Sequence, residues 1–147
     1  MKVIFESRKG VFIYVIIAFL LFILSISLFN FSSFNDLENH EYVISSVLII
    51  LSLSLLLWMY FDTKYELTAT NLNYKSGPIK GTIEIQKINT ILLKKTLWSG
   101  TRPALASNGL VIKFGTYDEI YISPETNESF VKELSKINKN IEIVQSN

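Results

Sequence analysis

Two long apolar segments without charge constrain this chain more than any other feature of its sequence. They cover residues 11–29 and 43–61, and each has 19 residues with no charged residue, glycine or proline. At about 1.5 Å per residue, each helix would measure roughly 28 Å, close to the ~30 Å hydrocarbon core of a bilayer. Buried helices of a soluble core are the alternative, but covering two helices that are apolar on every side takes a much larger protein. The sequence therefore predicts two membrane-spanning helices.

The flanks of these segments predict their orientation. Lys2, Arg8 and Lys9 precede the first segment, no basic residue lies in residues 30–41, and eleven follow residue 61. By the positive-inside rule, both termini face the cytoplasm and the chain is a multi-pass protein of the cell (inner) membrane. A signal peptide is the alternative for the first segment, but the apolar run is too long and no small-residue cleavage site follows it. The two helices then form an antiparallel hairpin that anchors the chain in the lipid bilayer.

The composition excludes most catalytic and nucleic-acid-binding chemistry. The formal net charge is +1, the chain has no cysteine, and its one histidine, His40, falls in the predicted external loop. These counts argue against disulfides, thiolate nucleophiles, histidine metal sites and Ser–His–Asp triads, and they predict no nucleic-acid partner. Asp118 and Glu119 are adjacent on a predicted strand, so they point to opposite faces and cannot share a proton or a metal. We expect no enzyme, no cofactor and no metal.

The pattern of the sequence changes after residue 61. Residues 62–147 alternate polar and apolar side chains, which predicts a cytoplasmic domain behind a membrane hairpin of residues 1–61. Ser123 as N-cap, Pro124 at the first helical position and a following apolar stripe predict a C-terminal helix. Strands covered by one amphipathic helix make the fold class α+β, with a bent antiparallel sheet or an open β-barrel.

Turn residues divide this domain into strands. Period-two alternation flanks turns at Thr70-Asn71, Gly77-Pro78 and Gly115-Thr116. Residues 88–95 add another apolar stretch, and residues 97–108 predict a long loop because they contain glycine, proline and several serines and asparagines. The pattern predicts about six antiparallel strands.

Several short segments carry a resemblance to a known family. They are TKYELTATNLN at residues 63–73, IEIQKINTI at 83–91, residues 103–107 ahead of LVIKF, and ISP at 122–124 followed by Phe130, Leu134 and NKNIEI. Over most of residues 63–143 the chain resembles the small bacterial PH-like domains of the YyaB type. The resemblance implies a PH-like barrel or bent sheet capped by its C-terminal helix, commonly behind one or two N-terminal spans. One branch of this family looks like the immunity proteins that protect bacteriocin producers from their own product.

Basic and aromatic residues of the domain are the candidate contacts with a partner or with lipid. Trp98, Arg102, Lys94 and Lys95 lie in the predicted loop or just before it. Close to an anionic leaflet, each basic side chain contributes about 1 kcal/mol to lipid binding. Two alternatives stay open, namely a solvated face for the charges and a lid over the barrel for Trp98.

The sequence as a whole predicts a binding or interaction module at the inner leaflet. The leading hypothesis is recognition of a protein partner through a sheet edge or through residues 97–108. The alternatives are bacteriocin self-immunity, an anionic-lipid-binding module, and an enzyme whose site the sequence does not reveal. No small-molecule ligand is indicated.

Overall fold

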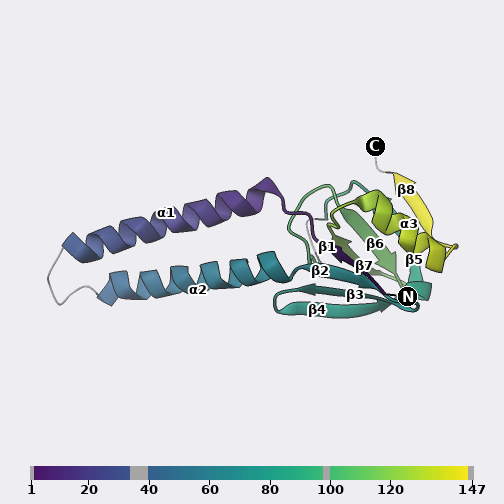
Figure 1. Cartoon of the computed structure of the whole chain (residues 1–147), viewed down its shortest axis with the longest axis horizontal. Coiled ribbons are helices and arrows are strands. Elements are labelled where there is room, and N and C mark those ends of the chain that lie inside the picture. The colour runs from purple at the N-terminus through teal and green to yellow at the C-terminus, as the bar shows by residue number, and fades with distance from the viewer. Residues whose placement is uncertain (1, 34–39, 98–99, 146–147) are drawn as a thin grey trace.

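The computed structural model describes residues 2–33, 40–97 and 100–145, and it places a long helical hairpin at one end of a small domain (Figure 1). Helix α1 spans Val11–Ser33 and helix α2 spans His40–Asp62. The two helices are antiparallel and in contact, because the Tyr14 and Tyr60 hydroxyls lie 2.9 Å apart near the domain and Ser27 Oγ lies 2.9 Å from Ser46 Oγ farther out.

Both helices are long and apolar enough to cross a membrane. Only 11% of the residues in the apolar stretch of α1 and 6% of those in α2 are buried. A helix in a soluble core would be mostly buried, so this alternative for residues 11–29 and 43–61 does not describe the fold. The exposed apolar surface suggests association with a membrane.

The domain consists of two four-stranded sheets and one helix. The first sheet has the order β1-β2-β3-β4, and the second has the order β7-β6-β5-β8. All strand pairs are antiparallel except β5 and β8, which run parallel. The strands are β1 (Val3–Glu6), β2 (Lys64–Leu67), β3 (Asn71–Ser76), β4 (Ile79–Glu84), β5 (Ile88–Leu93), β6 (Leu110–Phe114), β7 (Asp118–Ile122) and β8 (Glu142–Gln145).

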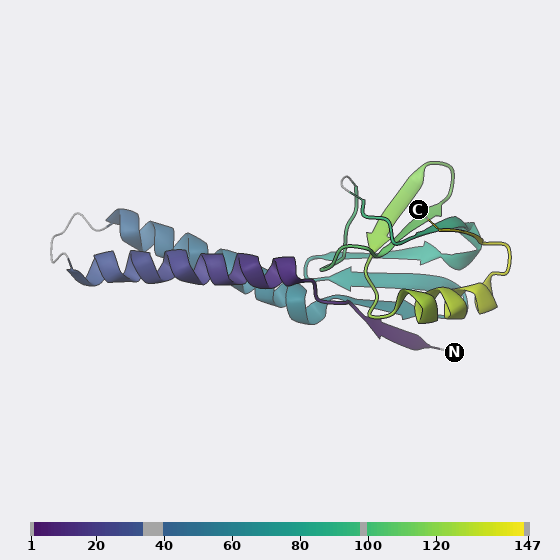
Figure 2. The same cartoon turned by 90° about the horizontal axis from the view of Figure 1, so that it is seen from above.

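A single apolar core lies between the two sheets and helix α3 (Asn127–Ile137). Buried residues alternate along the strands, as in β2, where Tyr65 and Leu67 face inward and Lys64 faces solvent. Helix α3 adds Phe130 and Leu134, which are fully buried. In Figure 2, α3 lies beside the sheets at the end of the chain, and its apolar stripe closes the core.

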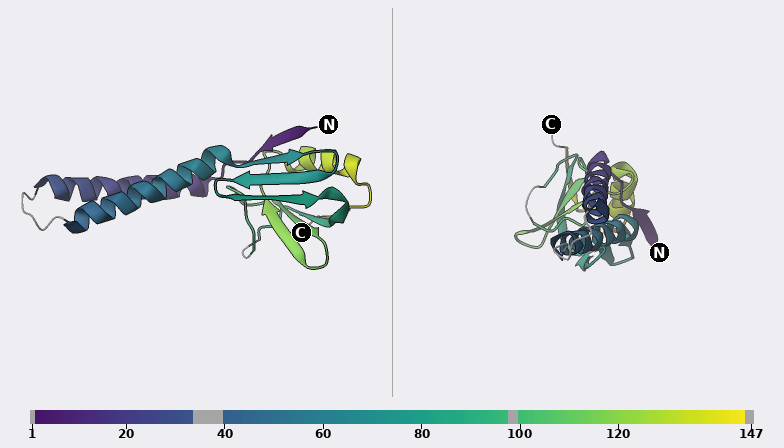
Figure 3. Two further views of the ribbon diagram at one scale, coloured as in Figure 1. Left: turned by 90° about the horizontal axis from the view of Figure 1, so that it is seen from below. Right: turned by 90° about the vertical axis from the view of Figure 1, so that its left-hand side faces the viewer.

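The predicted α+β fold is confirmed, and the strands do not close into a barrel among the residues that the structure describes. The turns predicted at residues 70–71, 77–78 and 115–116 join β2 to β3, β3 to β4 and β6 to β7. Gly77 and Gly115 adopt φ values of 54° and 59°, which favour glycine. The strands of the first sheet run along the same direction as the helices (Figure 3).

Two strands, β1 and β8, are additional to the six that the sequence predicts. Strand β1 pairs with β2 over Val3–Glu6, so the chain enters the first sheet, leaves as α1, returns as α2 and re-enters the same sheet. The predicted division into residues 1–61 and 62–147 stays a prediction. Strand β1 belongs to the first sheet although it lies within residues 1–61.

The predicted start of the C-terminal helix is wrong. Helix α3 begins at Asn127, with Thr126 at the cap position, rather than at Pro124 after an N-capping Ser123. Residues 124 and 125 lie outside the helix because Pro124 bridges to Ser7 and the Glu125 N–H donates to the Glu6 carbonyl. Pairing with the N-terminal segment therefore delays the helix by one turn.

Candidate functional site

A buried polar network joins the domain to the first helix. The Tyr65 hydroxyl donates to the Pro103 carbonyl at 2.6 Å and accepts from the Ser123 N–H at 3.1 Å. Ser7 and Ser123 share a hydrogen bond of 2.9 Å between their hydroxyls, and the Leu105 N–H donates to Ser123 Oγ. Burial raises the pKa of the Tyr65 phenol above its usual value, so it stays a neutral donor. The network fixes the chain just before α1 to the middle of the domain.

Residues 100–109 are held against this junction by side chains from β7 and from the segment ahead of α1. The Tyr121 hydroxyl donates to the Ala106 carbonyl at 2.7 Å and accepts from the Gly109 N–H at 2.9 Å. Arg8 Nη2 donates to the carbonyls of Ser107 and Asn108. The described part of the predicted long loop is therefore fixed to the domain, and we call residues 100–109 the wall.

A glycine lets this wall approach helix α1 closely. The Gly10 N–H donates to the Leu105 carbonyl at 3.1 Å. A Cβ at Gly10 would lie 3.0 Å from both the Leu105 oxygen and the Ala106 Cα, so a side chain there would push the wall away. The wall and the first turn of α1 thus enclose a narrow space.

We call this space the junction groove. Its lining residues come from the first turn of α1, the last turn of α2 and the wall: Arg8, Gly10, Val11, Phe12, Ile13, Met59, Arg102, Ala104, Leu105, Ala106 and Ser107. Arg8 and Arg102 are the two arginines of the chain, and both line it. The other lining residues are mostly apolar, so the groove joins two cationic groups to an apolar wall.

Aromatic side chains lie at the same level of the helices. Tyr14 and Tyr60 pack edge to face with ring centroids 5.9 Å apart, and the Lys9 ammonium lies 4.5 Å from the centroid of the Tyr60 ring. Trp58 is half exposed one turn away. Tyrosine and tryptophan next to basic residues are typical of the boundary between hydrocarbon and headgroups.

The structure separates the residues that the sequence singles out as candidate contacts. Arg102 lies in the junction groove with its guanidinium carbon 4.9 Å from the centroid of the Tyr121 ring. Lys94 lines a neighbouring hollow, which Arg8 also lines, together with the carboxylates Glu125, just before α3, and Glu128, in its first turn. Lys95 is exposed beyond the end of β5. Trp98 lies outside the described residues.

Arg8 is the functional candidate that the sequence analysis missed. In the sequence it lies beside Lys9 ahead of an apolar segment, and this position indicates only the orientation of the first helix in the membrane. Its contact with Asn108 spans 100 residues of sequence, and no local pattern predicts such a contact. The available signal was composition, because the chain has twelve lysines and only two arginines.

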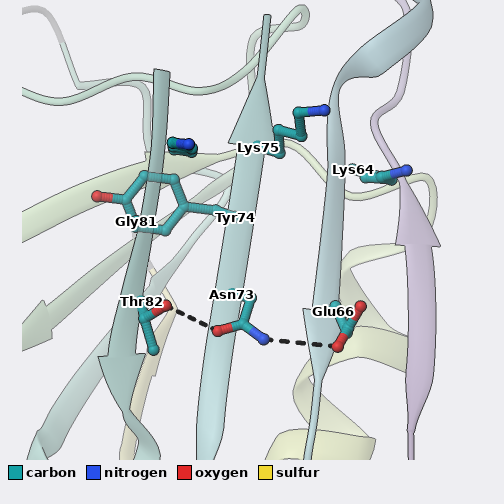
Figure 4. A pocket seen from close by; sticks show the side chains of 8 residues that line it. Lys64, Glu66, Asn73, Tyr74, Lys75, Gly81 and Thr82 are labelled. Carbon is teal, nitrogen blue, oxygen red and sulfur yellow. Dashed lines mark hydrogen bonds between the residues drawn. The ribbon is translucent and has the colours of Figure 1, made fainter. Parts of the chain in front are cut away.

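The outer face of the first sheet forms a second, more open hollow (Figure 4). Asn73 bridges its neighbours, accepting from the Thr82 hydroxyl at 2.9 Å and donating to Glu66 at 3.5 Å. The Tyr74 ring lies across Gly81, where a Cβ would clash with it. The Lys2 ammonium lies 2.9 Å from Glu66, and this hydrogen bond lowers the pKa of the Glu66 carboxyl. Polar groups here mostly satisfy one another, so this face resembles an ordinary solvated surface.

No group of three or more histidine, cysteine or acidic residues that could hold a metal occurs in the described ranges. The acidic pair Asp118 and Glu119 sits at the start of β7, opposite Phe114 and Lys113 of β6. The lone histidine, His40, begins α2, residues 30–33 of the predicted external loop extend α1, and residues 34–39 lie outside the described residues.

Comparison with known proteins places the chain in a family. The family described as Bacterial PH domain matches residues 63–138, which is more than half of the chain. The chain is 28% identical over 139 residues to the uncharacterized protein YyaB of Bacillus subtilis (strain 168), and the alignment covers 94% of each sequence, including both apolar helices. No solved structure matches. The chain therefore belongs to the bacterial PH domain family, as a YyaB-like member with two apolar helices inserted after its first strand.

Proposed function

We propose that this protein is a membrane-anchored binding module that holds its PH-like domain against the cytoplasmic leaflet and recognises a protein partner there. The observation that carries the proposal is the direct connection of both helices to one sheet. Four residues separate β1 from α1, and one residue separates α2 from β2. Since both connections are short and the first is held by the buried network, helices embedded in a bilayer would fix the domain next to its surface.

The charges near the helix ends support the cytoplasmic side. Arg8, Lys9 and Lys64 flank the helices where these join the domain, and Lys75 lies close by, bound to Asp62 at 2.9 Å. Basic residues beside a membrane-spanning helix favour the cytoplasm. The proposal therefore keeps both termini on that side and makes the chain a multi-pass protein of the inner membrane.

Strand β8 supports a role in protein recognition. Two of the four sheet edges are partly covered in the described parts of the chain, since Ser7 just after β1 bridges to Pro124 and Ile120 of β7 bridges to Thr101, while the β4 edge carries Lys80. The outer edge of β8 has no partner among these residues, and all four of its side chains are exposed. Ile143 and Val144 are 46% and 36% exposed. An open, partly apolar edge without lysine suits the addition of a strand from a partner.

Photocrosslinking in cells tests this role. A photoreactive amino acid at Ile143 is expected to give a discrete protein adduct, and the same amino acid at Tyr117, which is 94% exposed at a turn, is expected to give none. Val144→Lys should abolish the adduct because a charge at an edge opposes strand addition, and Tyr117→Lys should leave it intact. Equal adducts at both positions, or an adduct that survives Val144→Lys, would refute recognition through β8.

Bacteriocin self-immunity is the second candidate function, and it rests on the family resemblance and the two helices. It predicts that deletion of the protein raises sensitivity of the cell to a membrane-active toxin made by the same strain. Unchanged sensitivity would remove this candidate while leaving the binding role in place.

A further inference from the structure

We propose that the hollow beside the start of α3 binds a small water-soluble zwitterion, namely a free amino acid or a short peptide with one ammonium and one carboxylate group. The hollow has a volume of about 480 Å³, a size typical of small-molecule sites. Its lining residues come from the segment ahead of α1, the residue after β5, the wall and the start of α3: Arg8, Lys94, Asn108, Glu125, Thr126, Asn127 and Glu128. We call it the α3 hollow. The inference rests neither on the membrane placement nor on the protein partner.

Charges of both signs line the α3 hollow without neutralising one another. Arg8 and Lys94 supply two positive charges, and Glu125 and Glu128 supply two negative ones. Within the described ranges, none of these four residues takes part in an ion pair. A simple anion would be repelled by the two carboxylates, and a simple cation by the two basic groups. A ligand that carries one charge of each sign can contact both kinds of group at once.

Asn127 adds a hydrogen-bond acceptor that lacks a donor within the described fold. The residue is only 6% exposed, and its Nδ2 donates to the Asn108 carbonyl at 3.0 Å. Its Oδ1 is buried and has no hydrogen-bond partner in the part of the chain that the structure describes. A buried carbonyl oxygen without a donor is costly. An ammonium group bound beside Asn127 and Glu128 would supply the missing donor and meet a negative charge at the same place.

The basic side of the hollow has donors left for a carboxylate. Arg8 uses Nη2 for the carbonyls of Ser107 and Asn108, and its other N–H groups have no acceptor among the described residues. Lys94 has a φ of 55°, a backbone conformation that lysine rarely adopts. Such a conformation persists only where the surrounding structure imposes it. The fold therefore holds a second cation at this hollow at a cost in backbone energy.

The polar character of the lining points to a water-soluble ligand rather than to a lipid. No apolar residue lines the α3 hollow, whereas Val11 and Phe12 line the junction groove. A zwitterionic lipid would need an apolar surface for its acyl chains next to its headgroup. A free amino acid or a short peptide has two charges and few apolar atoms, so it matches a lining that is polar throughout.

Saturation-transfer NMR of the full-length protein in detergent tests the inference, with glycine and triglycine as probes. Their ammonium and carboxylate groups lie at different separations, and we expect saturable binding of at least one of the two. The N-acetylated form of the bound probe lacks the ammonium, and the amidated form lacks the carboxylate. Each blocked form should bind about tenfold more weakly, as expected when one charge-assisted contact is lost. Phosphatidylethanolamine added to the micelles should not compete.

Substitutions in the hollow provide an independent comparison. Lys94→Gln and Glu125→Gln should each weaken binding of the probe about tenfold. Both side chains are exposed and unpaired within the described residues, so these variants should retain their melting temperature. Lys95→Gln is the matched control, since it removes the adjacent exposed charge, which does not line the hollow, and should bind the probe like the wild type.

Several results would overturn the inference. They are the absence of saturable binding for both probes, undiminished binding of a blocked form, unchanged binding by Lys94→Gln, equal weakening by Lys95→Gln, and competition by phosphatidylethanolamine. None of these results bears on β8 or on the helical hairpin, so the inference can fail while the proposed function stands.

Discussion

At the residue scale, the Tyr65 hydroxyl joins three segments that are far apart in the sequence. Its partners Pro103 and Ser123 lie 38 and 58 residues away. The side chain is completely buried, and so is the Ser123 N–H that it satisfies. A buried donor or acceptor that loses its partner costs about 1–3 kcal/mol, so this hydroxyl is a strong determinant of the junction.

Tyr65→Phe should therefore lower the free energy of unfolding by about 2 kcal/mol, because it leaves the Pro103 carbonyl and the Ser123 N–H without their partner. Thermal unfolding of the purified protein followed by circular dichroism measures the change. Tyr74→Phe is the matched control: the Tyr74 ring packs beside Gly81 against the same core, its hydroxyl has no hydrogen bond among the described residues, and removal of that hydroxyl should change stability by less than about 0.5 kcal/mol. Equal effects of the two substitutions would contradict the network.

Residue roles of this kind were the least predictable from the sequence. Ser123 has the right type and position for a helix N-cap, and local pattern gave it that role. Instead, Ser123 bonds to Ser7, and Pro124 bridges to the same residue. These partners are more than a hundred residues apart in the sequence. The same distance hid Arg8, whose loop contacts depend on the path of the chain out of the hairpin and into the domain.

At the element scale, strand β1 is the part of the domain that the hairpin separates from the rest. It pairs with β2 along four residues, and Phe5 packs edge to face on Phe130 of α3 with ring centroids 5.1 Å apart. Ile4 lies on the other face of the strand and is 55% exposed. The strand thus contributes one side chain to the core and closes one edge of the first sheet.

Phe5→Ala should destabilise the domain by about 2 kcal/mol, less than the ~3–5 kcal/mol of a fully buried phenylalanine because Phe5 is only partly buried. Ile4→Ala, one residue away on the same strand, should cost less than about 0.5 kcal/mol. Chemical denaturation of both variants in the same detergent gives the comparison. Similar losses for the two would mean that β1 does not pack on the core.

Elements with strong local patterns were predictable, and the two terminal strands were not. The turns between β2 and β3 and between β6 and β7 have turn residues between alternating strands, and those signals are contained in the sequence itself. Strands β1 and β8 have four residues each and, unlike the equally short β2, are not joined to a neighbouring strand in sequence by a tight turn. Each of them forms only because a neighbouring strand is already in place.

At the scale of the whole molecule, a hairpin of two exposed apolar helices continues into a domain whose polar network and junction groove lie where the helices enter it. The two helices were predictable, because a run of apolar residues needs no tertiary partner to be recognised, although each has 23 residues where the apolar run has 19. The tight connection to the domain was not, since it depends on β1. Anchoring and orientation are the claims on which the proposed placement of the domain at the membrane depends.

The absence of cysteine from the chain makes the membrane placement directly measurable. Single cysteines are introduced at Asn35, between the two helices in sequence, and at Lys139, which is exposed on the domain, and intact cells are treated with a membrane-impermeant maleimide. We predict labelling of Asn35→Cys in intact cells and of Lys139→Cys only after the membrane is permeabilised. Labelling of Lys139→Cys in intact cells, or identical labelling of the two positions, would contradict a hairpin that spans the membrane beneath a cytoplasmic domain.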